Sequence, residues 1–168
     1  MPNAVCVLTT DAGFVVLVRD KSDQRWTFPG GGLDPGERAH EACLREFREE
    51  AGFPFPDQVP YSLVYSTNKI TNQTAHFFFT IEQTALVDWA KHNNGVDFAR
   101  YGNPYNLTKN PTWKAQTKSS YKEMDRVELV PIMDFKDSVA RQSSGNGGVQ
   151  WPVKQSLLRS IRKAFEKM

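Results

Sequence analysis

The sequence has few cysteines, little net charge and no long hydrophobic run. Its two cysteines, Cys6 and Cys43, lie among apolar or small neighbours, which favours buried free thiols in a reducing compartment. No apolar segment approaches the roughly 20 residues that a membrane-spanning helix needs. The first residues also lack the basic and apolar regions of a signal peptide. These absences predict a cytoplasmic protein with no membrane partner.

The composition that remains is that of one folded domain. Hydrophobic residues make up 39% and charged residues 24% of the 168 positions, which is ordinary for a soluble globular protein. A chain of this length buries a core without disulfides. The net charge of +2 is too small to indicate nucleic acid by itself and is compatible with an anionic small substrate. We expect a single domain over residues 1–168, working as a monomer or a homodimer.

The hydrophobic pattern predicts short strands and two clear helices. A helix is expected from about Glu37 to Ala51, ended by Gly52. An amphipathic helix is expected at about 152–167, with Pro152 in its first turn. Because strands and helices alternate irregularly, we predict an α/β fold with a mixed sheet between helices. The strands are expected at residues 4–8, 14–18, 26–28, 61–65, 74–81 and 127–130.

Residues 88–120 differ in composition from the rest of the chain. They are rich in Asn, Lys, Thr and Tyr and poor in aliphatic residues, so we interpret them as an insertion or long loop, with a short helix at about 85–92. Basic residues alternate there with aromatic ones such as Trp113, a pattern that can bind a nucleotide or a single strand. A polar loop with no binding role is an equal alternative.

Glu46, Glu49 and Glu50 share one face of the first expected helix. At about 100° per residue, Glu49 and Glu50 lie roughly 60° and 40° to either side of Glu46. Like charges this close destabilise an isolated helix. The same face carries small residues, which leave room for a ligand. A hard divalent cation, which prefers carboxylate oxygens, would compensate the charge; a solvated acidic face is the alternative.

Other residues around the acids complete the pattern. Arg45 is placed to orient a carboxylate, either Glu37 or a helix acid. The glycines at 30–32 allow close backbone approach; their carbonyls can bind a metal, while nearby N–H groups and the helix N-terminus can bind a phosphate. Arg19 could reach substrate phosphates, although an exposed residue at a strand end is nearly as good an interpretation. This combination suits metal-assisted attack of water on a phosphoanhydride.

The stretch from residue 31 to 53 resembles the Nudix box, G-x5-E-x7-R-E-U-x-E-E-x-G-U, where U is a bulky apolar residue. Every defined position is filled. The resemblance covers about residues 3–83 and 127–135. It implies an α/β/α sandwich that hydrolyses a phosphoanhydride bond in a nucleoside diphosphate linked to another moiety. The matching residues are Gly31, Glu37, Arg45, Glu46, Phe47, Glu49, Glu50, Gly52 and Phe53.

Carried onto this sequence, the resemblance implies that Glu46, Glu49 and Glu50 bind Mg²⁺ or Mn²⁺ with a backbone carbonyl of Gly30 or Gly31. The base that deprotonates the attacking water is left open between a helix acid, Glu49, and a distant loop acid, for which Glu123 is the candidate. Glu128 and Glu82 are weaker alternatives. Arg45 is expected to orient the site. The candidate substrate contacts are Arg19, Gly30, Gly32 and Trp113.

Three functions follow from this set. The leading one is a small-molecule pyrophosphohydrolase acting on ADP-ribose, a nucleoside triphosphate or a dinucleoside polyphosphate. The second removes a cap from RNA. The third is a non-catalytic nucleotide-binding module, which the complete set of acids argues against. Among the remaining aromatic residues, the outward-facing member of residues 77–79 could contact a base, whereas Trp151 is expected to be a packing anchor.

Overall fold

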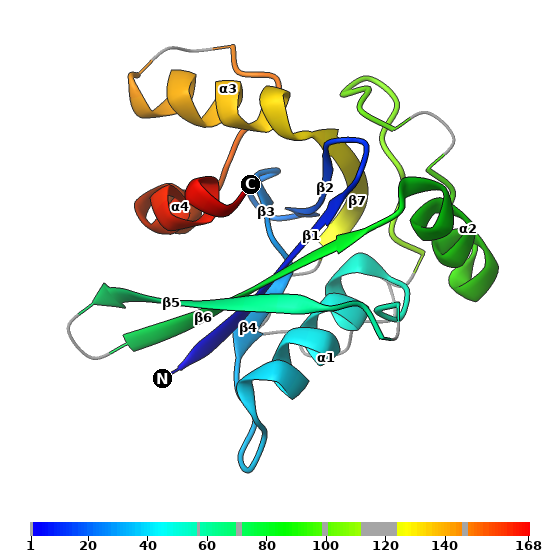
Figure 1. The fold of residues 1–168 in the computed structure, drawn as a ribbon. Helices are drawn as coiled ribbons and strands as arrows, with labels where there is room; N and C mark the ends of the chain where they lie inside the picture. The colour runs from blue at the N-terminus through cyan, green and yellow to red at the C-terminus, as the bar shows by residue number, and fades with distance from the viewer. Residues whose placement is uncertain (1, 57, 70–71, 99–100, 112–123, 146–147) are drawn as a thin grey trace.

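A computed structural model describes residues 2–56, 58–69, 72–98, 101–111, 124–145 and 148–168 (Figure 1). Within them, seven strands form one mixed sheet with the order β3-β2-β1-β6-β5, while β4 pairs with β1 and β7 pairs with β2. β1 runs parallel to β6 and antiparallel to β2. The strands are β1 (Asn3–Thr10), β2 (Phe14–Asp20), β3 (Trp26–Thr27), β4 (Gly30–Gly32), β5 (Tyr61–Lys69), β6 (Asn72–Ile81) and β7 (Met124–Pro131).

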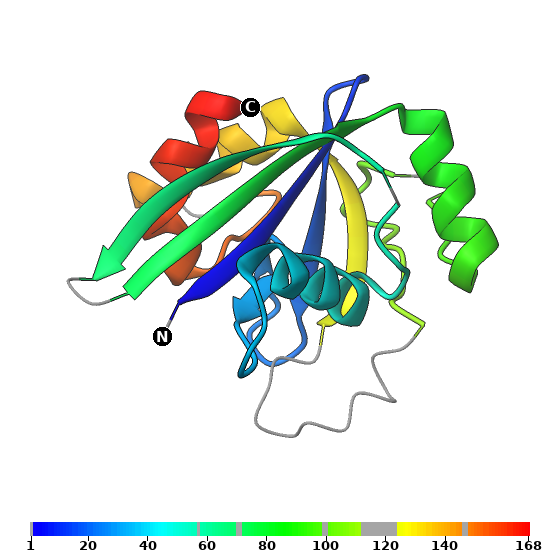
Figure 2. The same ribbon diagram turned by 60° about the horizontal axis from the view of Figure 1, so that its bottom comes forward.

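Helices cover both faces of this sheet, as Figures 1 and 2 show. One core contains the buried face of α1 and part of α2, and a second core contains the buried residues of α3 and α4. The predicted α/β fold with a mixed sheet between helices is therefore confirmed. The helices are α1 (Ala39–Ala51), α2 (Gln83–Asn94), α3 (Ile132–Ser143) and α4 (Gln155–Lys167).

The central strands are apolar on both sides because both sides are covered. In β2, Val16 and Val18 belong to the core under α1, while Val15 and Leu17 belong to the core under α3 and α4. A strand buried on both faces is a continuous apolar run and not an alternating one. The same burial corrects the expectation for residues 77–79, since all three phenylalanines are buried and none faces outward to meet a base.

The C-terminal helix starts later than the sequence pattern indicated. Pro152 lies outside α4: its carbonyl accepts a hydrogen bond from the Trp26 N–H at 2.7 Å, and the Lys154 N–H donates to the Trp26 carbonyl at 3.0 Å. These bonds cover the edge strand β3, whose backbone groups would otherwise lack partners. Trp151 is fully buried and packs edge-on against Trp26 with ring centroids 5.2 Å apart, which confirms its role as a packing anchor.

The region interpreted as an insertion is partly built into the fold. Its first residues belong to α2, which contains the short helix predicted at 85–92. After α2, Val96 and Phe98 are buried in the core under α1, and Asn110 is fully buried. The composition of residues 88–120 is polar, but Val96 and Phe98 place the segment that directly follows α2 in the core.

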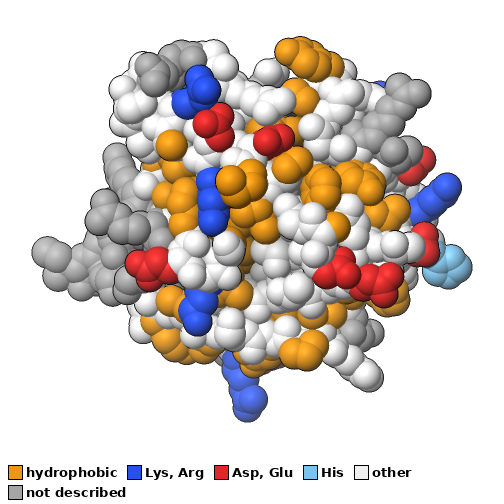
Figure 3. Space-filling model, turned by 45° about the horizontal axis from the view of Figure 1, so that its top comes forward, with side chains coloured by type: hydrophobic (Ala, Val, Ile, Leu, Met, Phe, Trp, Pro, Cys, Tyr) orange, Lys and Arg blue, Asp and Glu red, His pale blue; other side chains and the backbone are white. Residues whose placement is uncertain are grey.

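Both cysteines are buried and free, as predicted, and burial raises the pKa of the Cys6 thiol. Across the described residues, no helix is long and apolar enough to cross a membrane. On the face shown in Figure 3, acidic and basic side chains are interspersed among apolar and neutral ones.

Candidate active site

The backbone of β4 lies unusually close to its neighbours because it consists of glycines. A Cβ atom on Gly30 would come within 2.6 Å of the Ala4 carbonyl oxygen in the adjacent β1. A Cβ on Gly31 would come within 2.6 Å of the Glu46 Oε1 atom on α1. Real side chains do not tolerate such contacts, so the two glycines let a strand and a carboxylate approach the same stretch of backbone.

Gly31→Ala is therefore expected to reduce activity at least tenfold, because the added methyl would displace the Glu46 carboxylate; displacements of about 1 Å cost up to 10²-fold in enzymes. Gly32→Ala is the matched comparison. Its Cβ would meet nothing closer than Asn3 Oδ1 at 3.8 Å, which is an ordinary contact. Steady-state kinetics of the two variants tests this reasoning, and equal losses in both would contradict it.

The three helix acids have different environments. Glu50 is buried, with 6% of its surface exposed, and its Oε1 accepts a hydrogen bond from the Gly30 N–H at 2.7 Å. The Glu46 side chain is largely buried, with 15% exposed, whereas the Glu49 side chain is 46% exposed. The acid that is fixed most firmly is thus Glu50, and the acid most open to solvent is Glu49.

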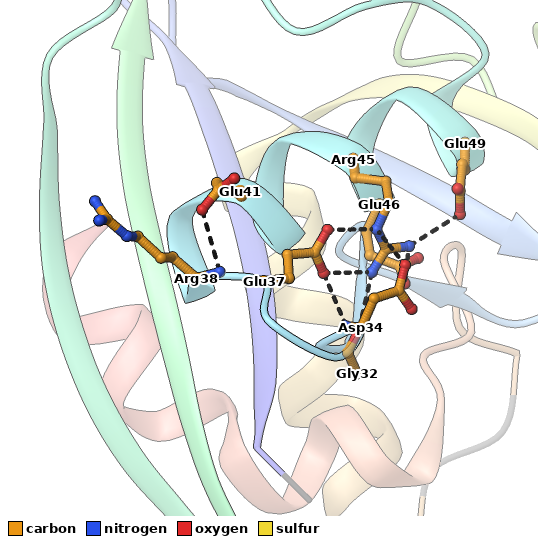
Figure 4. A network of polar contacts seen from close by, with 8 residues as sticks. All are labelled: Gly32, Asp34, Glu37, Arg38, Glu41, Arg45, Glu46 and Glu49. Atoms are coloured by element: carbon orange, nitrogen blue, oxygen red, sulfur yellow. Dashed lines mark hydrogen bonds and ion pairs between the residues drawn. The ribbon is translucent and has the colours of Figure 1, made fainter.

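Arg45 is the centre of the polar network drawn in Figure 4. Its Nε and Nη2 atoms donate to the two Glu37 carboxylate oxygens at 2.8 and 2.9 Å. Its Nη1 donates to Glu46 at 3.0 Å and to Glu49 at 3.3 Å, and Nη2 also donates to the Gly32 carbonyl at 3.0 Å. From the sequence, either Glu37 or a helix acid was expected to be the partner of Arg45. In the structure, Arg45 binds Glu37 and also the helix acids Glu46 and Glu49.

The charges around Arg45 leave an acidic excess. Asp34 completes the group with an ion pair at 3.3 Å, so four carboxylates, counting Glu37, Glu46 and Glu49, share one guanidinium. The hydrogen bonds to Glu37 raise the pKa of Arg45 beyond its already high ordinary value, and the guanidinium remains charged at every accessible pH. One positive charge does not neutralise four negative ones, and the site therefore favours an additional cation.

The available donors fit a hard divalent cation. They are carboxylate oxygens and glycine carbonyls, the ligands that Mg²⁺ and Mn²⁺ prefer, and Gly31 keeps the backbone open beside the Glu46 carboxylate. In the part of the chain that the structure describes, no three acidic, histidine or cysteine side chains form a preassembled metal group. The acids are instead held by Arg45 and by the Gly30 N–H.

The remaining described candidates, Arg19 and Glu82, lie outside α1 and β4. Arg19 donates to both Asp125 carboxylate oxygens, at 3.1 and 3.0 Å, and its side chain is mostly buried; its contact with substrate stays a prediction. Glu82 immediately precedes α2. Trp113 and Glu123 lie outside the described residues. Sequence reasoning missed Asn110, whose side chain binds the backbone of α1 from 60 positions away, because no local pattern marks such a contact.

Glu128, the weaker candidate for the base, is fully buried in β7. It accepts hydrogen bonds from the Leu129 N–H at 3.0 Å and the Thr108 N–H at 3.3 Å. Burial raises the pKa of this carboxyl from 4.5 to about 7. Because the pKa of Glu128 is higher in the folded protein than in the unfolded chain, the protonated carboxyl stabilises the fold. This stabilisation is complete below the pKa of the unfolded chain and is lost as the pH rises through the pKa of the folded protein.

Glu128→Gln is therefore expected to gain stability over the wild type as the pH rises from about 5 to about 8, by roughly 1 to 3 kcal/mol. The neutral amide avoids the cost of ionising a buried carboxyl. Urea unfolding of both proteins at the two pH values measures the difference. A stability difference that is the same at both pH values would show that the carboxyl does not titrate in this range.

Comparisons with known proteins identify a family for this chain. A family model described as NUDIX domain matches residues 1–124. The RNA pyrophosphohydrolase of Pseudomonas putida is 41% identical over 56 residues, which are 33% of this chain and 35% of that protein. The chain thus matches about a third of the length of these curated relatives.

Solved structures of other proteins have a fold similar to that of this chain. The Ap4A hydrolase of C. elegans aligns with 99% of both chains at a TM-score of 0.51 and 17% identity. The NUDIX domain of Shewanella oneidensis NrtR, complexed with ADP ribose, aligns with 99% of this chain and 87% of that chain at a TM-score of 0.51 and 16% identity. Because the family model covers residues 1–124, about three quarters of the sequence, this chain belongs to the NUDIX family.

Proposed function

We propose that this protein is a divalent-metal-dependent pyrophosphohydrolase that cleaves a phosphoanhydride bond in a nucleotide-type substrate. The observation that carries the proposal is the set of acids on α1 beside the glycine stretch. Arg45 holds Glu46 and Glu49, and the Gly30 N–H holds the Glu50 carboxylate. A non-catalytic binding module would not need to keep all of these groups. Their arrangement concentrates negative charge beside the backbone at which a phosphate and a cation can meet.

Glu46, Glu49 and Glu50, with the Gly31 carbonyl, would hold Mg²⁺ or Mn²⁺. When bound, such an ion polarises phosphoryl oxygens and lowers the pKa of water. Glu50 suits the role of a fixed ligand because its carboxylate is buried and accepts the Gly30 N–H. The N-terminal end of α1 would attract the phosphates of the substrate.

Glu49 is the described acid best suited to accept a proton from water. Its side chain is the most exposed of the three, and water can therefore reach it. Arg45 contacts the Glu49 carboxylate at 3.3 Å, which fixes its position beside the other acids. Glu123 remains the alternative base. Arg45 itself orients Glu37, Glu46 and Glu49 and does not need to touch the substrate.

Two substrate classes are compatible with the site. A small nucleoside diphosphate derivative is the leading class, because the acids and glycines of the site suit the phosphoanhydride that such a substrate contains. The 5′ phosphoanhydride of RNA is the second, favoured by the identity to RNA pyrophosphohydrolases over 56 residues. RNA recognition would add contacts to the strand, and its affinity would fall steeply with salt.

A substrate panel with product analysis tests the proposal. It should contain nucleoside triphosphates, ADP-ribose, NADH, dinucleoside polyphosphates, diphosphoinositol phosphates, 5′-triphosphate RNA and capped RNA, each with Mg²⁺ and with Mn²⁺. We expect metal-dependent turnover of at least one phosphoanhydride, with loss of turnover in chelator. If no member of the panel is hydrolysed with either ion, the proposal fails. Preference for RNA over the matching mononucleotide would decide for the second class.

A further inference from the structure

Asn110 joins the segment before β7 to the end of α1 that carries Glu50. Its side-chain Nδ2 donates to the Glu50 carbonyl at 2.7 Å. Its backbone N–H donates to the Asp125 carbonyl in β7 at 3.0 Å. The residue is fully buried. A single asparagine therefore connects the acidic helix to the central sheet through two hydrogen bonds that water does not reach.

The end of α1 is shaped around this asparagine. Gly52 caps the helix with φ of 86°, a left-handed conformation that favours glycine. A Cβ atom at Gly52 would overlap Asn110 Oδ1 and lie 3.2 Å from Pro111 Cδ. Gly52 thus serves two purposes: it ends the helix, and it leaves the space that the Asn110 amide fills.

A second asparagine provides a contrast at the same helix end. Asn94, at the end of α2, donates to the Gly52 carbonyl, but its side chain is exposed. Water can take over a hydrogen bond at an exposed site, whereas a buried carbonyl that loses its donor bears the full cost of desolvation. Both asparagines donate to carbonyls at the end of α1. Loss of the buried Asn110 hydrogen bond should cost more free energy than loss of the exposed Asn94 hydrogen bond.

Glu50 is therefore fixed at two points. Asn110 holds its backbone carbonyl at 2.7 Å, and the Gly30 N–H holds its carboxylate at 2.7 Å. If the backbone bond is lost, the last turn of α1 can shift, and the carboxylate moves with it. Residues that orient metal ligands in this indirect way typically change metal affinity by about 10- to 100-fold.

We propose that Asn110 is a positioning residue for Glu50, which sets the metal affinity of the site through the backbone of α1 without touching substrate. This inference rests on the proposed function, in which Glu50 is a metal ligand. It also assigns a purpose to Asn110 within the described residues 101–111: its side chain supports the backbone at the end of the acidic helix.

Mn²⁺ binding to the substrate-free protein, followed by electron paramagnetic resonance, tests the inference. Asn110→Ala is expected to weaken Mn²⁺ binding about tenfold, and higher metal concentrations should recover part of the lost kcat. A variant that binds Mn²⁺ as tightly as the wild type overturns the inference and leaves the proposed function standing. A wild-type protein that binds no Mn²⁺ overturns the proposed function itself, and the inference with it.

Two control variants separate positioning from stability. Asn94→Ala removes the exposed amide from the same helix end. Ser138→Ala removes a buried hydroxyl that accepts a hydrogen bond from the backbone N–H of Trp151 at 3.1 Å in the opposite layer. We expect both to keep wild-type Mn²⁺ affinity, although Ser138→Ala lowers the Tm. If Ser138→Ala weakens Mn²⁺ binding as much as Asn110→Ala does, the effect is general destabilisation and the inference is wrong.

A further measurement needs no variant and covers the case in which Asn110→Ala does not fold. In the wild-type protein, a Mg²⁺ titration followed by nuclear magnetic resonance should shift the side-chain amide signals of Asn110 and leave those of Asn94 nearly unchanged. Asn110 signals that do not move while Mg²⁺ binds would overturn the inference, because they would show that the metal site and this amide are not connected.

Discussion

Glu49→Gln is expected to lower kcat by roughly 10²- to 10⁴-fold, the range that loss of a general base produces, while the protein stays folded. The substitution keeps the size of the side chain and removes its charge. It therefore removes one ligand of the proposed cation and the described acid best placed to accept a proton from water. Because the Glu49 side chain is 46% exposed, the free energy of unfolding should change by less than about 0.5 kcal/mol.

Glu41→Gln is the matched control for this prediction. Glu41 lies on the same helix and is also exposed, but it accepts the Arg38 N–H at the start of α1, a bond that glutamine can also accept. Its kcat should equal that of the wild type. If Glu49→Gln retains most of the activity, Glu49 is neither an essential ligand nor the base, and Glu123 becomes the principal candidate for the base.

Arg45→Ala is expected to reduce kcat/KM at least 10²-fold, because the catalytic groups that Arg45 orients would be misplaced. It is also expected to lower the free energy of unfolding by about 2 to 3 kcal/mol, because the charged hydrogen bonds would lose their donor. Glu37 and Glu46 are largely buried, with side chains 14% and 15% exposed. Without the guanidinium their negative charges repel each other. Their pKa values should rise, and the acid limb of the pH–rate profile should move to higher pH.

Arg45→Lys should rescue little of this loss. One ammonium cannot reproduce the planar fork that binds both Glu37 oxygens at 2.8 and 2.9 Å and still reaches Glu46 and the Gly32 carbonyl. Arg48→Ala, at an exposed position of the same helix, is the control and should leave the pH–rate profile unchanged. An Arg45→Lys enzyme with wild-type kinetics would mean that only the charge matters, and the orienting role would be wrong.

The acidic site was predictable because its parts are close together in the sequence. The spacing of Glu46, Glu49 and Glu50 alone places them on one face of a helix. The structure confirms the helix and brings the glycine stretch against it. Arg45 was also expected to orient an acid, although its simultaneous contacts with Glu37, Glu46 and Glu49 depend on side-chain geometry that spacing does not contain.

Features that depend on distant contacts were not predictable in this way. The hydrogen bond from Asn110 to Glu50 joins positions 60 residues apart, and asparagine in a polar stretch looks like any loop residue. Residues 152–154 pair with β3, which is also far away in the sequence. The sequence did not predict this pairing, because a proline before an amphipathic pattern is typical of the start of a helix. Phe78 was misread because a strand covered on both faces has no outward side.

The proposed function assigns metal-dependent hydrolysis of a phosphoanhydride to the acids of α1. Its most direct test is turnover of the preferred substrate in water labelled with heavy oxygen, with mass spectrometry of both products for the wild type and Glu49→Gln. We expect the wild type to place one labelled oxygen in a phosphate of one product, only when Mg²⁺ or Mn²⁺ is present, and Glu49→Gln to incorporate almost none. Metal-independent labelling, or equal labelling by Glu49→Gln, would contradict it.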